Sequence, residues 1–319
     1  MEVQTANEPG QLILDDATGK QIASFHGFGF PVWLDNGHFL AYRSDAMPDN
    51  IDKFYEVPGI LVDAGSGVAT DLDLPCCAAL GNGHGSLALT AAADPASPKY
   101  VVWSNGEEST ARSGEPVAWS PKGDRVAVRH PAPGSRGGGG WMEVLSWPGL
   151  SPIFQSDKSR GTGTLKFDPS GNFGAFASSS DSASDPTTEI DVVNLTNQSV
   201  ASMSDTDRGT FAWTSAIQLV VCDGATQTTY AIDGAIADVK SGADDSWIEG
   251  SADGSTLLTY TRDDTYNLTG ISYTRNGQVA DLDLPPGQFD RAWIAPNGSD
   301  IVVVTFSGDG SEAYMAALL

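Results

Sequence analysis

The chain has 319 residues and carries 41 acidic against 17 basic side chains, which gives a formal net charge of −24. A field of that sign repels nucleic acid phosphates and anionic membrane surfaces, so neither is an expected partner. No stretch approaches the roughly 20 apolar residues that a membrane-spanning helix needs, and the cysteines, which number three, do not make a disulfide framework.

The N-terminal segment, MEVQTANEPG, has no charged region followed by an apolar one, so no signal peptide is expected in it. A cytoplasmic protein would begin in this way. A protein whose signal or membrane anchor had been removed just before Met1 would begin in the same way, so both remain open at this point.

Along the chain one phrase recurs: an aromatic residue, a short turn, and an alternating apolar strand. Each copy predicts a hairpin, since turns with Asn-Gly, Lys-Gly, Ser-Gly or Asp-Gly tolerate positive φ. The step between copies, about 35 to 48 residues, is typical of propeller blades. The copies lie at 31–42, 76–90, 116–128, 164–176, 210–222, 249–260 and 293–304, of which those at 76–90 and 210–222 are degenerate.

Most hairpins are followed by a third strand, and a shorter fourth strand then closes the unit. The phrase DLDLP, at 71–75 and again at 281–285, is this fourth strand in two different units. Its Asp and Leu residues alternate, as expected of a half-solvated outer strand. The expected third strands lie at 59–65, 99–106, 141–149, 189–197 and 268–277.

Helical periodicity is nearly absent from the sequence. Repeated four-stranded units of this length predict an all-β fold, a seven-bladed β-propeller of four-stranded antiparallel blades that forms a single domain over 1–319. Strand-like sequences lie near both ends of the chain, QLILDDATGKQIASF and EAYMAALL. They predict that the N- and C-terminal strands share a blade and close the ring. The aromatic residues before the hairpin turns should be buried between blades; they are Trp33, Trp119, Phe167 and Trp213.

The phrases WSPKG at 119–123, FDPSG at 167–171 and IAPNG at 294–298 resemble the TolB-like family, also described as WD-repeat-like propellers of the periplasm and cell surface. The resemblance implies mainly non-catalytic binding of proteins or peptides. Some members are enzymes or accessory domains of peptidases. It further implies a periplasmic, cell-surface or secreted protein, with a cytoplasmic one left open, and a sensor or docking domain of a longer membrane-anchored protein.

Motifs for catalysis are missing from the sequence: there is no G-x-S-x-G, H-E-x-x-H, P-loop or dinucleotide fingerprint. Only four histidines are present, of which His38 and His84 fall in or beside hairpin turns. Cys76 and Cys77 could form a vicinal disulfide of the kind found beside a quinone cofactor, or be two small core residues. Acidic-glycine clusters at 15–19, 205–209 and 308–312 do not match a calcium loop and are expected to be turns.

In a propeller, the loop that enters each innermost strand lies on the face where the central channel opens. Arginine and aromatic side chains on these loops are candidate binding residues, because interface hot spots are rich in both. The alternative is that the arginines pair with neighbouring acids and tie the blades together. The predicted binding residues are Phe28, Phe30, Arg112, Arg160, Arg208, Phe289 and Arg291, with Arg136 and Trp141 near them.

A rim of guanidinium groups would capture carboxylates at short range despite the net charge. The predicted function is therefore a non-catalytic extracytoplasmic recognition module. It would bind a protein or peptide partner that bears carboxylates at the channel-entrance face. We expect it not to be an enzyme and to hold no cofactor or metal. The alternative is a propeller enzyme with its site at the channel mouth, either a metal-dependent lactonase-like hydrolase or a quinone-dependent oxidoreductase.

Overall fold

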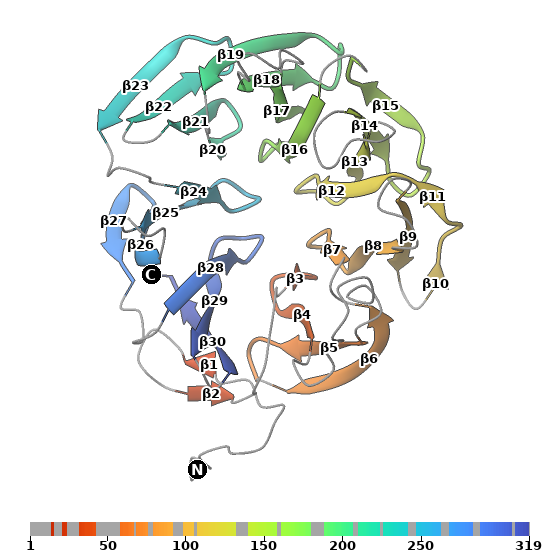
Figure 1. The fold of residues 1–319 in the computed structure, drawn as a ribbon, viewed down its shortest axis with the longest axis vertical. Helices are drawn as coiled ribbons and strands as arrows, with labels where there is room; N and C mark the ends of the chain where they lie inside the picture. Colours follow the sequence, from red (N-terminus) through yellow and green to blue (C-terminus); the bar gives the residue numbers. More distant parts are fainter. Residues whose placement is uncertain are drawn as a thin grey trace.

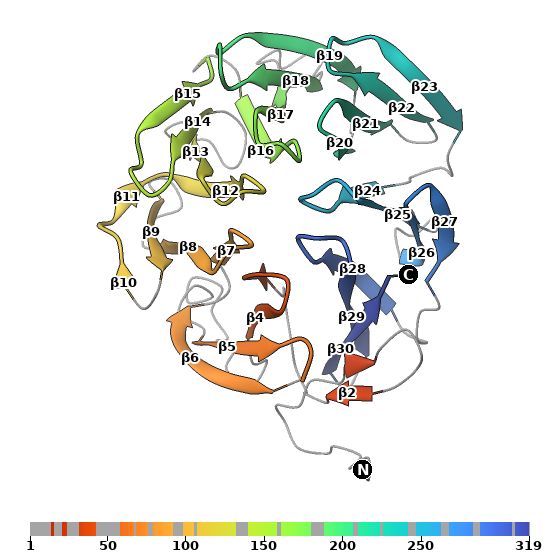
Figure 2. The same ribbon diagram turned by 180° about the vertical axis from the view of Figure 1, so that it is seen from behind.

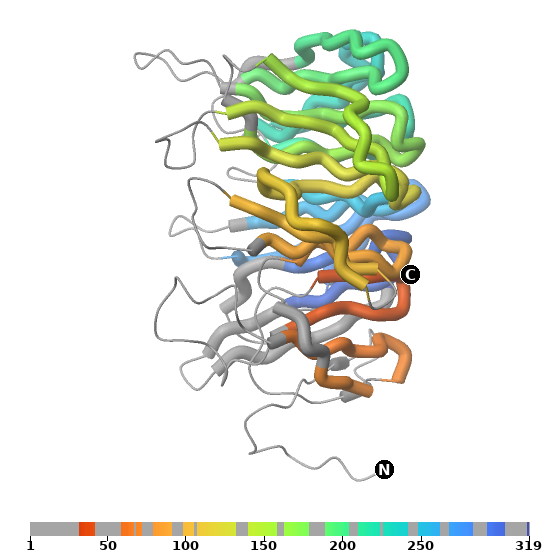
Figure 3. The backbone as a smooth tube through the Cα atoms, turned by 90° about the vertical axis from the view of Figure 1, so that its right-hand side faces the viewer, coloured from red at the N-terminus to blue at the C-terminus, as the bar shows by residue number. Residues whose placement is uncertain are grey.

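The structure is a computed structural model, in which the strands form a ring around a common axis (Figure 1). Viewed edge-on, the ring is a thick disc (Figure 3). The residues that it describes are 14–15, 21–23, 32–42, 58–66, 68–75, 79–91, 98–104, 107–131, 140–157, 161–179, 188–206, 210–223, 226–241, 247–262, 268–282, 288–307 and 310–318.

Seven innermost strands surround the axis, and each continues through a tight turn into a second, antiparallel strand. The innermost strands are β3 (Val32–Trp33), β7 (Ala79–Gly81), β12 (Glu115–Trp119), β16 (Gly161–Phe167), β20 (Thr210–Ser215), β24 (Trp247–Gly250) and β28 (Gln288–Ile294). Their partners are β4 (His38–Tyr42), β8 (Ser86–Ala91), β13 (Arg125–Pro131), β17 (Phe173–Ser179), β21 (Gln218–Asp223), β25 (Thr256–Arg262) and β29 (Asp300–Ser307). All the predicted hairpins are therefore formed.

Third and outer strands follow in the predicted order. The third strands are β5 (Pro58–Asp63), β9 (Lys99–Ser104), β14 (Gly140–Ser146), β18 (Thr188–Asn194), β22 (Thr226–Ala231), β26 (Leu268–Arg275) and β30 (Gly310–Ala317). The outer strands are β6 (Ala69–Pro75), β10 (Glu107–Glu108), β11 (Arg112–Ser113), β15 (Pro152–Gln155), β19 (Val200–Thr206), β23 (Ile236–Ser241) and β27 (Gln278–Asp281). The first DLDLP phrase lies in β6, so the outer-strand prediction is confirmed there, and of the second phrase Asp281 ends β27.

The number of blades differs from the prediction. Counted as separate sheets of four or more strands, the described residues form six blades rather than seven. The physical reason is a single bridge, Leu268 to Phe289, through which β26 pairs with β28 and merges β24–β27 with β28–β30 into one seven-stranded sheet. That the whole chain is one domain stays a prediction.

The N-terminal strands β1 (Leu14–Asp15) and β2 (Gln21–Ala23) pair with each other in a sheet of their own. Figures 1 and 2 both place them beside β30, which agrees with the proximity of β1 and β30. The expected sharing of one blade by N- and C-terminal strands is not established by this arrangement.

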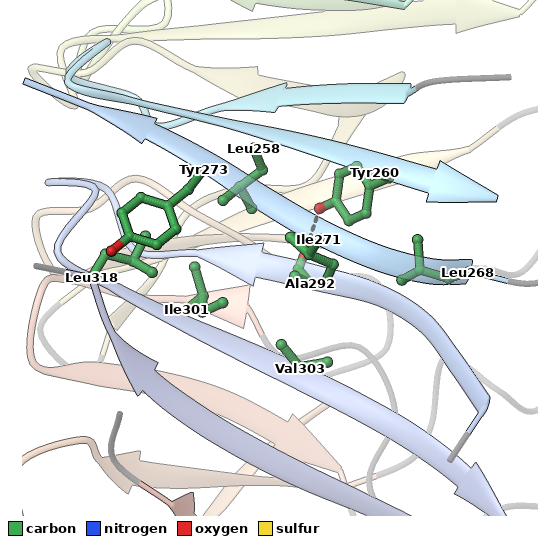
Figure 4. Packing of buried hydrophobic residues seen from close by; sticks show 9 residues of the cluster. All are labelled: Leu258, Tyr260, Leu268, Ile271, Tyr273, Ala292, Ile301, Val303 and Leu318. Carbon is green, nitrogen blue, oxygen red and sulfur yellow. Dashed lines mark hydrogen bonds between the residues drawn. The ribbon is translucent and has the colours of Figure 1, made fainter. Parts of the chain in front are cut away.

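The hydrophobic core lies between sheet layers and is divided into clusters around the ring. Figure 4 shows one cluster, in which Leu258 and Ile271 from β25 and β26 pack against Ala292 and Ile301 from β28 and β29. The hydroxyl of Tyr260 donates to the Ala292 carbonyl oxygen at 3.1 Å, which satisfies the polar end of a buried ring. No helix long and apolar enough to cross a membrane occurs within the described ranges.

Candidate functional site

In several innermost hairpin turns a polar side chain accepts from backbone N–H groups of the turn. Asp168 is the best example, because it follows Phe167 and is fully buried. Its carboxylate accepts from the backbone N–H groups of Ser170 and Phe173, at 2.9 and 2.7 Å. Such bonds close a turn locally. The glycine of the turn, Gly171, has a φ of 72°, a conformation that glycine adopts without strain.

The aromatic residues before the turns are buried, as predicted. Trp33, Trp119, Phe167 and Trp213 are between 3% and 8% exposed. Three of them also reach across to the neighbouring innermost strand through the indole N–H: Trp119 donates to the carbonyl of Leu80 at 2.9 Å, and Trp213 to that of Lys166 at 3.0 Å. Trp33 donates to Trp293 at 3.2 Å. The repeated aromatic residue therefore joins neighbouring hairpins as well as filling space.

Hydrogen bonds join every neighbouring pair of innermost hairpins around the ring. The bond from Trp33 to Trp293 connects the first hairpin to the last. In ring order the bonds that complete the circle are Gly85 to Leu34, Trp119 to Leu80, Arg125 to Gly171, Trp213 to Lys166, Ile248 to Thr210, Thr256 to Gly298 and Trp33 to Trp293.

A cavity of about 410 Å³ occupies the axis of the ring, lined by residues from all seven innermost strands. Its walls include the aromatic residues before the turns, and it extends to turn residues such as Gly83 and Pro121. The cavity therefore lies toward the hairpin-turn end of the channel, which is the end opposite to the predicted entry-loop rim. Its size falls within the range of small-ligand sites, about 300 to 1,000 Å³.

The charged side chains in the cavity wall are Lys166 on β16 and Glu249 on β24. The ammonium group of Lys166 donates to the Phe211 carbonyl at 2.8 Å and lies 5.4 Å from the centre of the Phe211 ring. The Glu249 carboxylate lies 3.4 Å from the hydroxyl of Tyr260, the same hydroxyl that donates to Ala292. Lys166 and Glu249 thus line one cavity from strands on either side of β20, with their charged ends next to Phe211 and Tyr260.

Sequence reasoning missed both of these residues. Each stands in an innermost strand, at a position where the repeated phrase predicts only a hairpin, and neither belongs to a recognisable motif. The signal that could have found Lys166 is its place directly before Phe167, since a lysine is unusual in so apolar a strand end. Glu249 gave no comparable signal, because its copy of the repeated phrase, 249–260, has no aromatic residue before the turn.

The predicted binding residues are only partly placed by the structure. Arg112 is exposed and lies in β11, which pairs with β9 at the outer edge of its sheet, away from the channel. Its guanidinium donates to the Leu150 carbonyl at 3.2 Å, so it ties one blade to the next. Arg112 therefore lies in an outer strand, where the sequence suggested an entry loop, and its binding role stays a prediction.

The other predicted binding residues are not tested. The backbone of Phe289 and Arg291 lies in innermost strand β28. Phe28, Phe30, Arg160, Arg208 and Arg136 lie outside the described residues, as do Cys76, Cys77 and most of the acidic-glycine clusters. The binding role of all these residues stays a prediction.

The histidines serve mainly in turns and blade contacts. His38 Nδ1 lies 3.0 Å from the Asp35 carboxylate, and His84 Nε2 lies 2.7 Å from the Pro121 carbonyl of the next blade. His130 stacks on Trp141 with ring centres 3.9 Å apart. Within the part of the chain that the structure describes, no three His, Cys, Asp or Glu side chains gather closely enough to hold a metal ion.

Comparisons with known proteins add to this picture at the level of the fold. No protein-family model and no curated protein matches the sequence. Among solved structures, the chain is similar to a prolyl endopeptidase at 13% identity, with 90% of this chain and 46% of that chain covered and a TM-score of 0.63. It is similar to the β-propeller domain of the Trilobed protease from Pyrococcus furiosus at 15% identity, with 72% and 78% covered and a TM-score of 0.54.

A match to TolB from Acinetobacter baumannii has 13% identity, covers 98% of this chain and 88% of that one, and has a TM-score of 0.49. Several further matches are peptidases as well. This finding corrects the expectation that the chain is not an enzyme, since its structural relatives are mainly the propellers of enzymes. The chain spans less than half of the prolyl endopeptidase that it matches. The resemblance to TolB-like propellers predicted a β-propeller, and at the level of fold the chain is one.

Proposed function

We propose that the chain binds a peptide, or an extended segment of a protein, in its central channel, and that it does so as the propeller domain of a peptidase system. The observation that carries this proposal is the axial cavity with its two opposite charges, Lys166 and Glu249. A short peptide carries an ammonium group at one end and a carboxylate at the other. The similarity to peptidase propellers supports the choice of a peptide over other zwitterionic ligands.

Recognition of a peptide in this chamber would combine two kinds of contact. Lys166 would attract a carboxylate and Glu249 an ammonium group, since charge-assisted hydrogen bonds are stronger than neutral ones. The indole and phenyl rings in the wall would contact apolar side chains. The carbonyl oxygens of the innermost strands would accept from the peptide backbone. The chamber is thus suited to an extended segment better than to a folded surface.

The untested expectations about the opposite face belong to the same proposal. Arg160, Arg208 and Arg291 with Phe28, Phe30 and Phe289 would form an outer rim through which a carboxylate-bearing partner approaches the channel. Terminal strands that share one blade and close the ring, and an extracytoplasmic location as a sensor or docking domain, are likewise proposed. The absence of nucleic acid and membrane partners is proposed on the net charge of −24.

The test is a titration with the pentapeptide Ala-Ala-Val-Ala-Ala, followed by tryptophan fluorescence, because Trp33, Trp119 and Trp213 line the cavity. We expect a saturable change with the free peptide and affinity about tenfold weaker when its termini are acetylated and amidated. A digest by the chain alone, monitored by mass spectrometry, shows in parallel whether peptide bonds are cleaved.

Charge-neutralising variants locate the peptide in the chamber. Lys166→Gln and Glu249→Gln should each weaken binding of the free peptide while leaving the blocked peptide unaffected. Lys240→Gln, on exposed strand β23, is the matched control and should behave as the parent. Equal affinities for the free and blocked peptides in the parent protein, or no saturable fluorescence change with either, would contradict the proposal.

A further inference from the structure

A second cavity of about 410 Å³ lies away from the axis, between two neighbouring blades. One wall comes from outer strand β15 and the residues after it, and the other from β17, β18 and β19 of the next blade. The residues that matter for its chemistry are Phe154, Asp157, Phe176, Asp191, Gln198 and Val200. This side pocket shares no lining residue with the axial cavity and does not depend on the function proposed for the channel.

The two phenylalanines give the side pocket an aromatic floor. Phe154 on β15 and Phe176 on β17 are 5% and 3% exposed, and their ring centres are 6.3 Å apart at an interplanar angle of 44°. Because they come from different blades, their rings are held by the packing of both. The face of a phenyl ring carries partial negative charge and attracts a cation.

A buried carboxylate stands beside this floor. Asp191 on β18 is 2% exposed, and hydroxyl groups donate to both of its oxygens: Ser178 to Oδ2 at 2.8 Å and Ser202 to Oδ1 at 2.6 Å. The hydroxyls fix the orientation of the carboxylate, which is a feature of a preorganised site.

The entrance of the side pocket is exposed and adds a second acid. Asp157, Gln198 and Val200 are all exposed, and Val200 is 50% exposed although it is a large apolar residue. Both charged groups in the lining are therefore acids, in contrast to the mixed charges of the axial cavity. The net charge of −24 strengthens the attraction for cations and repels anions at long range.

We propose that the side pocket binds an organic cation, a primary ammonium or guanidinium group carried on a small apolar body. The cationic group would bond to the Asp191 carboxylate, and the apolar body would lie on the rings of Phe154 and Phe176. A cavity of this volume accommodates a group of that size. The same chemistry is offered by a free amine and by an arginine or lysine side chain of a peptide, and the experiment separates these two sources.

The probes are 2-phenylethylammonium, its neutral analogue 2-phenylethanol, and N-acetyl-arginine amide, each titrated into the full chain by calorimetry. We expect 2-phenylethylammonium to bind at least about tenfold more tightly than 2-phenylethanol. Tighter binding of the arginine derivative than of the amine identifies a peptide side chain as the ligand. The reverse order identifies a free amine, and both orders support a cation site.

Two variants assign the binding to the side pocket. Asp191→Asn keeps the size of the side chain and should lower affinity for 2-phenylethylammonium by at least about tenfold, whereas Asp238→Asn on exposed β23 should not. If Asp191→Asn fails to fold, Val200→Trp replaces an exposed residue at the entrance and should reduce binding with an unchanged thermal midpoint. Equal binding of the amine and the alcohol, or unchanged binding in a folded Asp191→Asn, would overturn the proposal.

Discussion

The innermost and outermost strands of the ring differ in how far their side chains are buried. The aromatic residues that end the innermost strands, such as Trp119 and Trp213, are 8% and 3% exposed and are hydrogen-bonded to the neighbouring strand. In outer strand β23 all six residues are exposed, including Ile236 at 62% and Val239 at 56%. The difference shows that contacts near the axis determine how the blades are joined, while the outer edge is left largely to solvent.

Geometry explains this contrast. Blades converge toward the axis, so one large ring can fill the space between two strands and reach the next backbone carbonyl. They diverge toward the outside, where the side chains of a strand such as β23 are left exposed. Residues near the axis are therefore constrained from both sides, and we expect the free energy of unfolding to respond to substitutions in the same graded way.

The largest effect is expected from Trp213→Ala. It removes a buried ring and leaves a cavity between two blades, and such truncations cost about 3 to 5 kcal/mol. Trp213→Phe, which retains most of the volume but loses the hydrogen bond to Lys166, should cost less than half as much. Urea unfolding followed by circular dichroism measures both. A parent-like midpoint for Trp213→Ala would show that the inner ring does not hold the blades together.

A smaller effect is expected from Asp168→Ala in an innermost turn. The substitution leaves the N–H groups of Ser170 and Phe173 without their side-chain acceptor in a buried site, which costs about 1 to 3 kcal/mol. Asp168→Asn, which keeps one carbonyl acceptor, should recover part of the loss. If both variants unfold at the same urea concentration as the parent, the turn is held by its backbone alone.

Between the inner and outer regions, Cys222 on β21 provides a pH-dependent test. Burial, with a smaller contribution from the nearby Asp223 charge, raises the pKa of this thiol from 9.0 to about 11. Because the folded-state pKa is the higher one, the thiol stabilises the fold fully below pH 9, and this contribution is lost as pH rises from 9 to about 11.

The measurement is the difference in unfolding midpoint between the parent and Cys222→Ala over this pH range. The comparison cancels the titration of tyrosine and lysine side chains common to both proteins. We expect the difference to be constant below pH 9 and to shrink above it. A constant difference up to pH 11 would mean that Cys222 ionises equally easily in both states.

The smallest effect is expected at the outer edge, from Ile236→Thr in β23. The residue is 62% exposed, and surface substitutions of this kind usually change stability by no more than about 0.5 kcal/mol. Threonine also suits a strand, because it is β-branched. A loss of stability as large as that of Asp168→Ala would show that β23 is covered in solution, for example by another protein. The outer and inner strands would then not differ in burial.

Local patterns in the sequence were sufficient to predict much of the fold. The hairpin phrase, with its alternating apolar strand and turn residues, specified all seven inner hairpins, and the burial of Trp33, Trp119, Phe167 and Trp213 followed from their repeated position. The placement of DLDLP in an outer strand followed from its alternation of Asp and Leu. These features are decided within about 15 consecutive residues, where side-chain periodicity and turn chemistry act directly.

Contacts between segments distant in the sequence were decided only by the tertiary structure. The single bridge from Leu268 to Phe289 changed the sheet count, and the pairing of β11 with β9 moved Arg112 to the outer edge. Lys166 and Glu249 line one cavity because their strands converge on the axis. Likewise, Phe154 and Asp191 line one side pocket because two blades pack side by side. The periodicity of a strand determines which residues share a face, but the packing of sheets against each other determines what that face contacts.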